Sequence, residues 1–167
     1  MRLLSPDELR GVVAHEIGHI TNRDILVQSI AGVLASVVMV LANMMQWAAI
    51  FGGSRSDGEG GGNVFSALLV ALLAPIAASL IQFAISRSRE YLADATGAKL
   101  CGNPLSLASA LGKLGAYSKQ VPMQQGSPAT AHMFIVNPFA GGIGKFFSTH
   151  PPLEDRIHRL QEMARNG

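Results

Sequence analysis

Residues 14–19 read Ala14-His15-Glu16-Ile17-Gly18-His19. Two histidines four apart on an α-helix project from the same side, one turn above each other. That spacing lets a ring nitrogen of each histidine reach one tetrahedral Zn²⁺ at about 2.0–2.1 Å. Glu16 lies at the edge of the same face, where its carboxylate can act as a general base towards a water on the metal. The stretch therefore predicts two zinc ligands, His15 and His19, and a catalytic base, Glu16.

The residues around this stretch predict a helix with one apolar side. Ser5, Pro6 and Glu8 form the pattern of a capping box, with Ser5 as the N-cap and Pro6 at the first helical position. Apolar residues then recur at helical spacing: Leu9, Val13, Ile17 and Ile20. On a helical wheel this stripe points about 135° away from the histidines. We expect the stripe to be buried in a core while the other face holds the metal.

Two long runs without charged residues follow, at 25–51 and 64–85. As a helix, the first run would measure about 40 Å, which is enough to cross a hydrocarbon core of about 30 Å with some tilt. The residues between the runs, 52–63, are rich in glycine and polar residues and predict a flexible loop. Charged residues make up only 14% of the chain, against about 25% in ordinary soluble domains. These features predict a transmembrane hairpin; the alternative is a pair of buried helices in a soluble bundle.

Composition excludes several other classes of protein. The net charge of +2 is too small to indicate a nucleic-acid partner. A single cysteine, Cys101, excludes an intrachain disulfide, and the capped helix near Met1 does not resemble a signal peptide. We predict a zinc-binding helix at 1–24, the hairpin at 25–85 and the remainder of a protease core at 86–167.

A catalytic zinc site needs a third protein ligand. The remaining histidines, His132, His150 and His158, and the acidic residues are all candidates. Glu90 has the most favourable position, because a hairpin would return its helix to the side of the membrane that holds His15. Asp94, one helical turn later, can orient a ligand imidazole. From the residues alone, Glu90 can equally be an ordinary charge beside a membrane span.

A second region with candidate functional residues lies before the last predicted helix. His150 and Arg156 can both donate hydrogen bonds to an oxyanion that develops during peptide hydrolysis. A single histidine in front of a helix is also typical of a cap or a surface residue.

Three stretches, in this order and separated by the two apolar runs, resemble the HtpX family of bacterial membrane zinc metalloproteases, which are related to the CAAX prenyl proteases. They are AHEIGHITNRD at 14–24, SRSREYLADATGAKL at 86–100 and FSTHPPLEDRI at 147–157. The resemblance covers essentially the whole chain. It implies a mainly α fold, with a zincin-like metallopeptidase core and an inserted two-helix transmembrane hairpin.

The resemblance also implies a role for each residue that matches the family pattern. One Zn²⁺ per chain would be held by His15, His19 and Glu90, with Glu16 as the base. Asp94 matches the acidic residue of a Glu-x-x-x-Asp element, and His150 and Arg156 match a histidine and an arginine close to the substrate or transition state. The substrates implied are damaged or misfolded membrane proteins, cleaved in protein quality control.

The family pattern also includes a membrane hairpin and an edge strand ahead of the metal helix. We expect this chain to lack both, which leaves its own activity open. An alternative function is a non-catalytic membrane adaptor with a structural zinc, whose site would be closed by a fourth protein ligand. A protease with its motif inside the bilayer is disfavoured, because charges such as Glu8, Arg10 and Asp24 surround the motif.

The distribution of basic residues predicts the orientation in the membrane. The predicted loop at 52–63 contains one arginine beside two acidic residues. Most of the basic residues near the spans lie before the first run or after the second: Arg2, Arg10, Arg23, Arg87, Arg89 and Lys99. The basic residues therefore predict a zinc site in the cytoplasm, and the family resemblance implies a multi-pass protein of the bacterial inner membrane. Nothing in the sequence indicates the oligomeric state or the cleavage-site preference.

Overall fold

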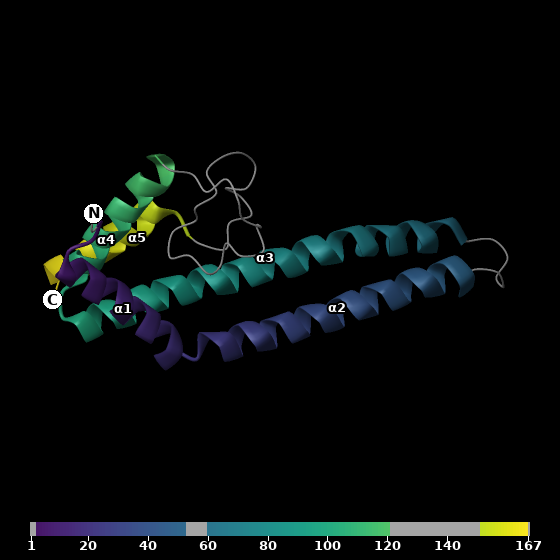
Figure 1. Ribbon diagram of the computed structural model, residues 1–167. Coiled ribbons are helices and arrows are strands. Elements are labelled where there is room, and N and C mark those ends of the chain that lie inside the picture. The colour runs from purple at the N-terminus through teal and green to yellow at the C-terminus, as the bar shows by residue number, and fades with distance from the viewer. Residues whose placement is uncertain (1–2, 53–59, 121–150, 167) are drawn as a thin grey trace. The chain divides into compact units, whose positions relative to one another are not determined.

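The computed structural model describes residues 3–52, 60–120 and 151–166, and these residues form helices without any strand (Figure 1). The mainly α fold class is thereby confirmed. The five helices are α1 (Pro6–Thr21), α2 (Asp24–Gly52), α3 (Gly60–Cys101), α4 (Pro104–Gln120) and α5 (Leu153–Asn166). Two compact units result: residues 1–25 with 86–167 form the first, and residues 26–85 form the second.

The N-terminus of α1 has the predicted capping box. The Ser5 amide donates to Glu8 Oε2 at 2.7 Å, and the Glu8 amide donates to Ser5 Oγ at 3.3 Å. Glu8 also accepts hydrogen bonds from two residues of α4, Ser109 (2.6 Å) and Lys113 (2.8 Å). The hydrogen bonds from Lys113, Ser109 and Ser5 lower the pKa of Glu8 to about 2. One carboxylate thus both caps α1 and ties it to α4.

The side of α1 that is buried is not the one that the sequence predicts. Within the described residues, the apolar stripe is exposed: Leu9, Val13, Ile17 and Ile20. The buried side is instead the one with small residues and a histidine: Gly11, Ala14, His15 and Gly18. The reason is close backbone packing. A Cβ atom at Gly11 would lie 2.8 Å from the backbone nitrogen of Leu107, so only glycine allows α4 to approach α1 this closely.

A small apolar core lies where α3, α4 and α5 meet. Asn103 caps α4 by accepting a hydrogen bond from the Leu105 amide at 3.0 Å, directly before Pro104 at the first helical position. The buried residues of this core come from all three helices: Ala98, Leu107, Ala108, Leu111 and Leu160. Leu153 and Ile157 of α5 pack against them.

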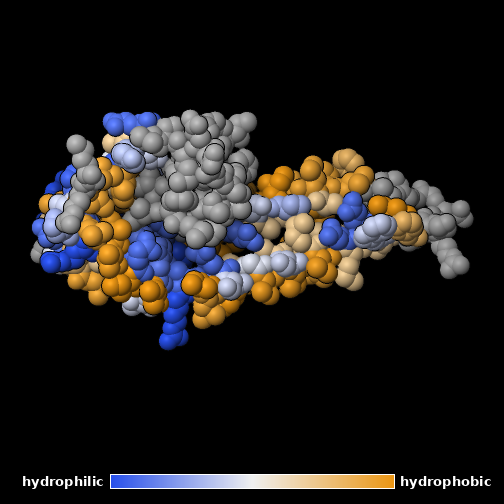
Figure 2. Space-filling view, viewed as in Figure 1, coloured by the Kyte–Doolittle hydropathy of each residue, from blue (hydrophilic) through white to orange (hydrophobic). Residues whose placement is uncertain are grey.

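The second unit contains most of α2 and the apolar part of α3. Two segments, Asp24–Ala48 and Leu68–Cys101, are long and apolar enough to cross a membrane. Only 6% of the most apolar 18-residue window in each is buried, so this part of the chain does not resemble buried helices of a soluble bundle. Figure 2 shows apolar side chains over most of the visible surface of this unit. Both features fit a membrane protein.

The contacts of Glu8 predict a pH-dependent stability. Because the pKa of Glu8 falls from 4.5 to about 2 on folding, its stabilising effect is complete above pH 4.5 and is lost as the pH falls to about 2. We expect Glu8→Gln to lower the unfolding temperature above pH 4.5 and to converge with the parent chain near pH 2. Thermal unfolding in detergent, followed by circular dichroism, measures this difference.

Asp7→Asn is the matched control for the Glu8 variant. Asp7 lies 3.9 Å from Arg10, and both side chains are more than 70% exposed. This pair should contribute little at any pH. An equal effect of the two substitutions would contradict the role given to Glu8.

Candidate metal centre

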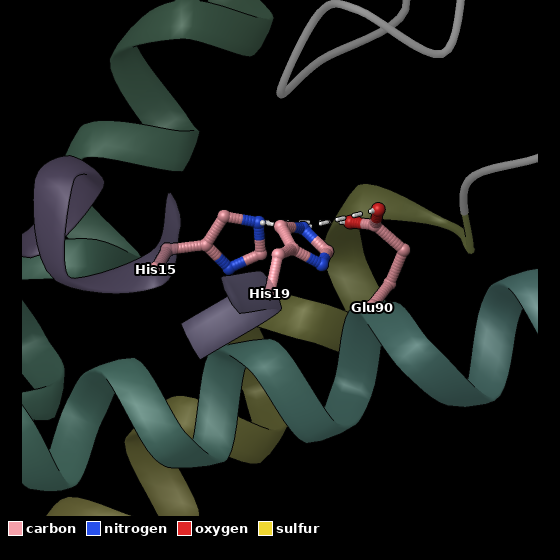
Figure 3. A group of neighbouring side chains, drawn as sticks. All are labelled: His15, His19 and Glu90. Carbon is pink, nitrogen blue, oxygen red and sulfur yellow. Dashed lines mark hydrogen bonds and ion pairs between the residues drawn. The ribbon is translucent and has the colours of Figure 1, made fainter. Parts of the chain in front are cut away.

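His15 and His19 project from one side of α1 towards a common point (Figure 3). Their Nε2 atoms are 3.1 Å apart, and the two rings meet edge to face with centroids 4.6 Å apart. His15 is buried, with 1% of its side chain exposed, whereas 25% of the His19 side chain is exposed. The helical spacing of the motif therefore brings two nitrogen donors together.

Glu90 of α3 completes this group from a distant part of the chain. Its carboxylate oxygens lie 3.8 Å from His15 Nε2 and 3.7 Å from His19 Nε2. One donor atom of each residue falls within 4.8 Å of the others, and no other group of this kind occurs among the described residues. Ligand bonds of about 2.0–2.1 Å at tetrahedral angles place donors about 3.3 Å apart. Two nitrogens and one oxygen at these separations fit a zinc ion.

Asp94 holds the far side of the His15 ring. Its Oδ1 atom lies 3.0 Å from His15 Nδ1, on the side away from the donor atom Nε2. Arg156 of α5 donates to both Asp94 oxygens, from Nε at 2.8 Å and from Nη2 at 2.7 Å. Asp94 is therefore placed where it can orient the His15 ring.

Arg156 lies beside the donor group and is 1% exposed. Besides its bonds to Asp94, its Nη1 atom is 3.1 Å from Glu90 Oε2. Burial alone would lower the pKa of Arg156, but the hydrogen bonds and charge of Asp94 outweigh that effect and raise it. The guanidinium therefore stays charged and joins two acidic residues of α3.

A second carboxylate, Asp24, holds His19 in the same way and was missed by the sequence analysis. Asp24 Oδ2 lies 2.6 Å from His19 Nδ1, and Arg89 of α3 binds Asp24 Oδ1 through Nε at 2.6 Å. Asp24 is only 2% exposed. A buried carboxylate at the start of a long apolar run is energetically unfavourable unless it has a polar or charged partner. The presence of Asp24 at this position is therefore the signal that could have predicted its role.

The site depends on close contact between the backbones of α1 and α3. A Cβ atom at Gly18 would lie 2.8 Å from the carbonyl oxygen of Ala93. A Cβ atom at Gly97 would lie 2.8 Å from both the amide nitrogen and Cα of His15. Two glycines, one from each helix, therefore let His15 and Glu90 reach the same point.

The remaining candidates occupy different environments. Glu16 is exposed on α1, next to His15 in the chain. His158 lies on α5 with 65% of its side chain exposed and pairs with Glu162 at 3.7 Å, so it does not join the donor group. His132 and His150 lie outside the described residues.

Comparison with known proteins identifies the family to which this chain belongs. A model of peptidase family M48 matches residues 1–164. The chain belongs to peptidase family M48. This family is one of metallopeptidases, so membership implies a metal and agrees with the grouping of His15, His19 and Glu90.

The most similar relatives include proteins named "Protease HtpX homolog" from bacteria and archaea. That of Syntrophobacter fumaroxidans is 61% identical over 165 residues, covering 97% of this chain and 58% of the relative. That of Desulforapulum autotrophicum is 55% identical, covering 100% of this chain and 54% of the relative. That of Pyrococcus furiosus is 57% identical, covering 98% of this chain and 57% of the relative. The resemblance to HtpX proteases predicted from the sequence is confirmed.

The chain spans little more than half the length of these curated relatives. No solved structure matches it.

The contact between Gly97 and His15 predicts that a single methyl group disturbs the site. A new Cβ would meet backbone atoms, which cannot rotate away as a side-chain end can. We expect Gly97→Ala to destabilise the chain by about 1–3 kcal/mol, as overpacking of a close contact does. Urea unfolding in detergent measures this change.

Gly112→Ala is the matched control for the Gly97 variant. Gly112 lies in α4, and a Cβ there meets nothing within 4 Å. Alanine should stabilise that helix by up to about 1 kcal/mol through its higher helix propensity. Equal stabilisation by the two substitutions would show that α1 and α3 do not pack in this way.

Proposed function

We propose that the chain forms the zinc-binding and catalytic part of a membrane-bound metalloendopeptidase of the HtpX type. The observation that carries this proposal is the convergence of His15, His19 and Glu90, with Glu16 beside them on α1, in a chain of family M48. The names of the relatives, which describe HtpX proteases, support the same activity.

Zinc is the metal that we propose for the site, with one ion per chain. Two imidazoles and one carboxylate are a donor set typical of catalytic zinc, which keeps its fourth position for water or substrate. A structural zinc would require a fourth protein ligand, and the group among the described residues contains three. This count favours a peptidase over an adaptor with a structural zinc.

In the proposed reaction, each residue has a separate role. Bound zinc would supply a Lewis acid that polarises the scissile carbonyl and acidifies a water molecule. Glu16 takes a proton from the attacking water and delivers it to the leaving amine, for which its exposed position on α1 is suited. Asp94 holds the ring of His15 so that Nε2 faces the donor group.

We assign different roles to His150 and Arg156. His150 remains our candidate donor to the developing oxyanion. The guanidinium of Arg156 is buried against Asp94 and Glu90, which favours a role in holding these two side chains. Its Nη2 atom also lies 3.5 Å from His15 Nε2, close enough to influence the charge at the donor group.

We further propose that the substrates are polypeptides, in particular damaged or misfolded membrane proteins that are cleaved in quality control. We also propose that the lipid bilayer surrounds α2 and the apolar part of α3. The multi-pass arrangement in the bacterial inner membrane rests on the two long apolar helices. The cytoplasmic position of the site rests on the excess of basic residues before and after the hairpin.

Glu16→Gln tests the function. This substitution retains the size of the side chain and removes the base. We therefore expect about one zinc per chain in both the parent and variant proteins, with loss of cleavage of fluorescent casein in the variant. Zinc content is measured by mass spectrometry on purified protein in detergent. Glu90→Ala is the comparison, because it should lose both zinc and cleavage. Cleavage by Glu16→Gln at the parent rate would show that Glu16 is not the base.

The orientation in the membrane is tested by labelling single cysteines in a Cys101→Ala background. A cysteine in place of Ser56, in the glycine-rich sequence between the two apolar runs, should react with an impermeant thiol reagent in cells whose outer membrane is permeabilised. A cysteine in place of the exposed residue Gln120, at the end of α4, should react only after the inner membrane is opened. The reverse pattern would place the metal centre outside the cytoplasm.

A further inference from the structure

We propose that Asp24 and Arg89 are positioning residues for His19, so that the two ends of the apolar hairpin set the orientation of a metal ligand. This inference rests on the proposed function, in which His19 binds zinc. It goes beyond that function by assigning a purpose to two charged residues that neither the motif nor the candidate ligand set includes.

The first observation is the contact between Asp24 and the His19 ring. Asp24 Oδ2 lies 2.6 Å from His19 Nδ1, a distance typical of a hydrogen bond to an ionised carboxylate. A proton held on Nδ1 leaves the lone pair of Nε2 free, and Nε2 is the atom that faces His15 and Glu90. Asp24 therefore selects the tautomer and the ring orientation that a metal requires.

The second observation is that Arg89 fixes Asp24. The Arg89 Nε atom donates to Asp24 Oδ1 at 2.6 Å, and Nη2 contacts the same oxygen. Nη2 also donates to the backbone carbonyl of Asn22 at 2.7 Å, so Arg89 binds the C-terminal end of α1 as well. Asp24 is 2% exposed, and a buried carboxylate of this kind is stable only with a charged partner.

The third observation is the position of these residues in the chain. Arg23 adopts a left-handed conformation, with φ of 54°, and turns the chain between α1 and α2. Asp24 is the first residue of α2, where a negative charge is favourable at a helix N-terminus. Arg89 directly precedes Glu90 in α3. The pair therefore links the start of the first apolar helix to the turn of α3 that supplies the third donor.

The same arrangement occurs at His15, which strengthens the interpretation. There, Asp94 contacts Nδ1 and Arg156 binds Asp94 through two nitrogens. Each histidine thus has a buried carboxylate on its far nitrogen, and each carboxylate has an arginine. A purely structural ion pair at the base of the hairpin would not require contact with the His19 ring.

Zinc affinity of the 167-residue chain in detergent tests the proposal, and it is measured by competition with a chromophoric chelator. We expect Asp24→Asn to weaken zinc binding by about 10–100-fold, the usual effect of removing the partner of a ligand histidine. Arg89→Gln should have a smaller effect in the same direction, because Asp24 would remain. Asp7→Asn is the control of equal charge change; it lies in the first turn of α1 and is exposed, and we expect parent affinity.

The double variant Asp24→Asn/Arg89→Gln separates a positioning role from a structural one. The double variant removes both the carboxylate and the guanidinium, so neither charge stays buried without a partner. Without metal, its unfolding temperature should therefore be closer to the parent value than those of the single variants. Its zinc affinity should remain low, because His19 still lacks its carboxylate. The absorption spectrum of bound Co²⁺ should also differ from that of the parent, since the second histidine is no longer held.

The outcomes distinguish this inference from the proposed function. One outcome would overturn the positioning role and leave the metal site intact. In that outcome the parent binds zinc, Glu90→Ala does not, and Asp24→Asn binds zinc as tightly as the parent. Parent-level zinc affinity in the double variant would also overturn the positioning role, because the Asp24–Arg89 pair would then affect only the stability of the fold. If Glu90→Ala binds zinc as tightly as the parent, the proposed metal site itself fails, and the role of Asp24 fails with it.

Discussion

The proposed metal centre depends on how closely the backbones of α1 and α3 approach each other. Histidine and glutamate side chains are short, so donors from two helices meet only when the helices are almost in backbone contact. Gly18 against Ala93, and Gly97 against His15, provide that contact. The donor atoms of His15, His19 and Glu90 then fall within 4.8 Å. Small residues on one side of α1 therefore matter more to the site than the large apolar residues on the other.

Close packing also brings charged groups out of water, and the chain compensates for this by pairing them. Among the residues that the structure describes, the buried acidic ones are Glu8, Asp24, Glu90 and Asp94. Lys113, Arg89 and Arg156 neutralise them across helix boundaries. For the buried pairs formed by Arg89 and Arg156, losing one partner typically costs about 3–5 kcal/mol, because the remaining charge stays buried. The ion pairs thus specify which helices pack together, while the apolar core formed with α4 and α5 supplies much of the burial.

Features that depend on nearby residues could be predicted from the sequence, and features that depend on packing could not. The capping box, the apolar runs and the spacing of His15 and His19 are local patterns, and the structure contains all three. The apolar stripe of α1 was assigned to the wrong environment. Periodicity shows which residues share a face, but not which face packs against another helix. The pairing of Asp24 with Arg89 joins residues 65 positions apart, and no local pattern indicates such a contact.

In the proposed peptidase, the exposed and buried sides of α1 would let one helix hold a metal and also meet a substrate. Around the helix axis, Glu16 lies about 60° from His19 and about 40° from Ile20, between the donor side and the exposed apolar side. The donors need burial, because a carboxylate on Nδ1 orients a histidine best where water does not compete. A base needs access, because the polypeptide must reach it. The order of residues in His-Glu-x-x-His satisfies both demands, since it places the glutamate at the boundary where α1 changes from buried to exposed.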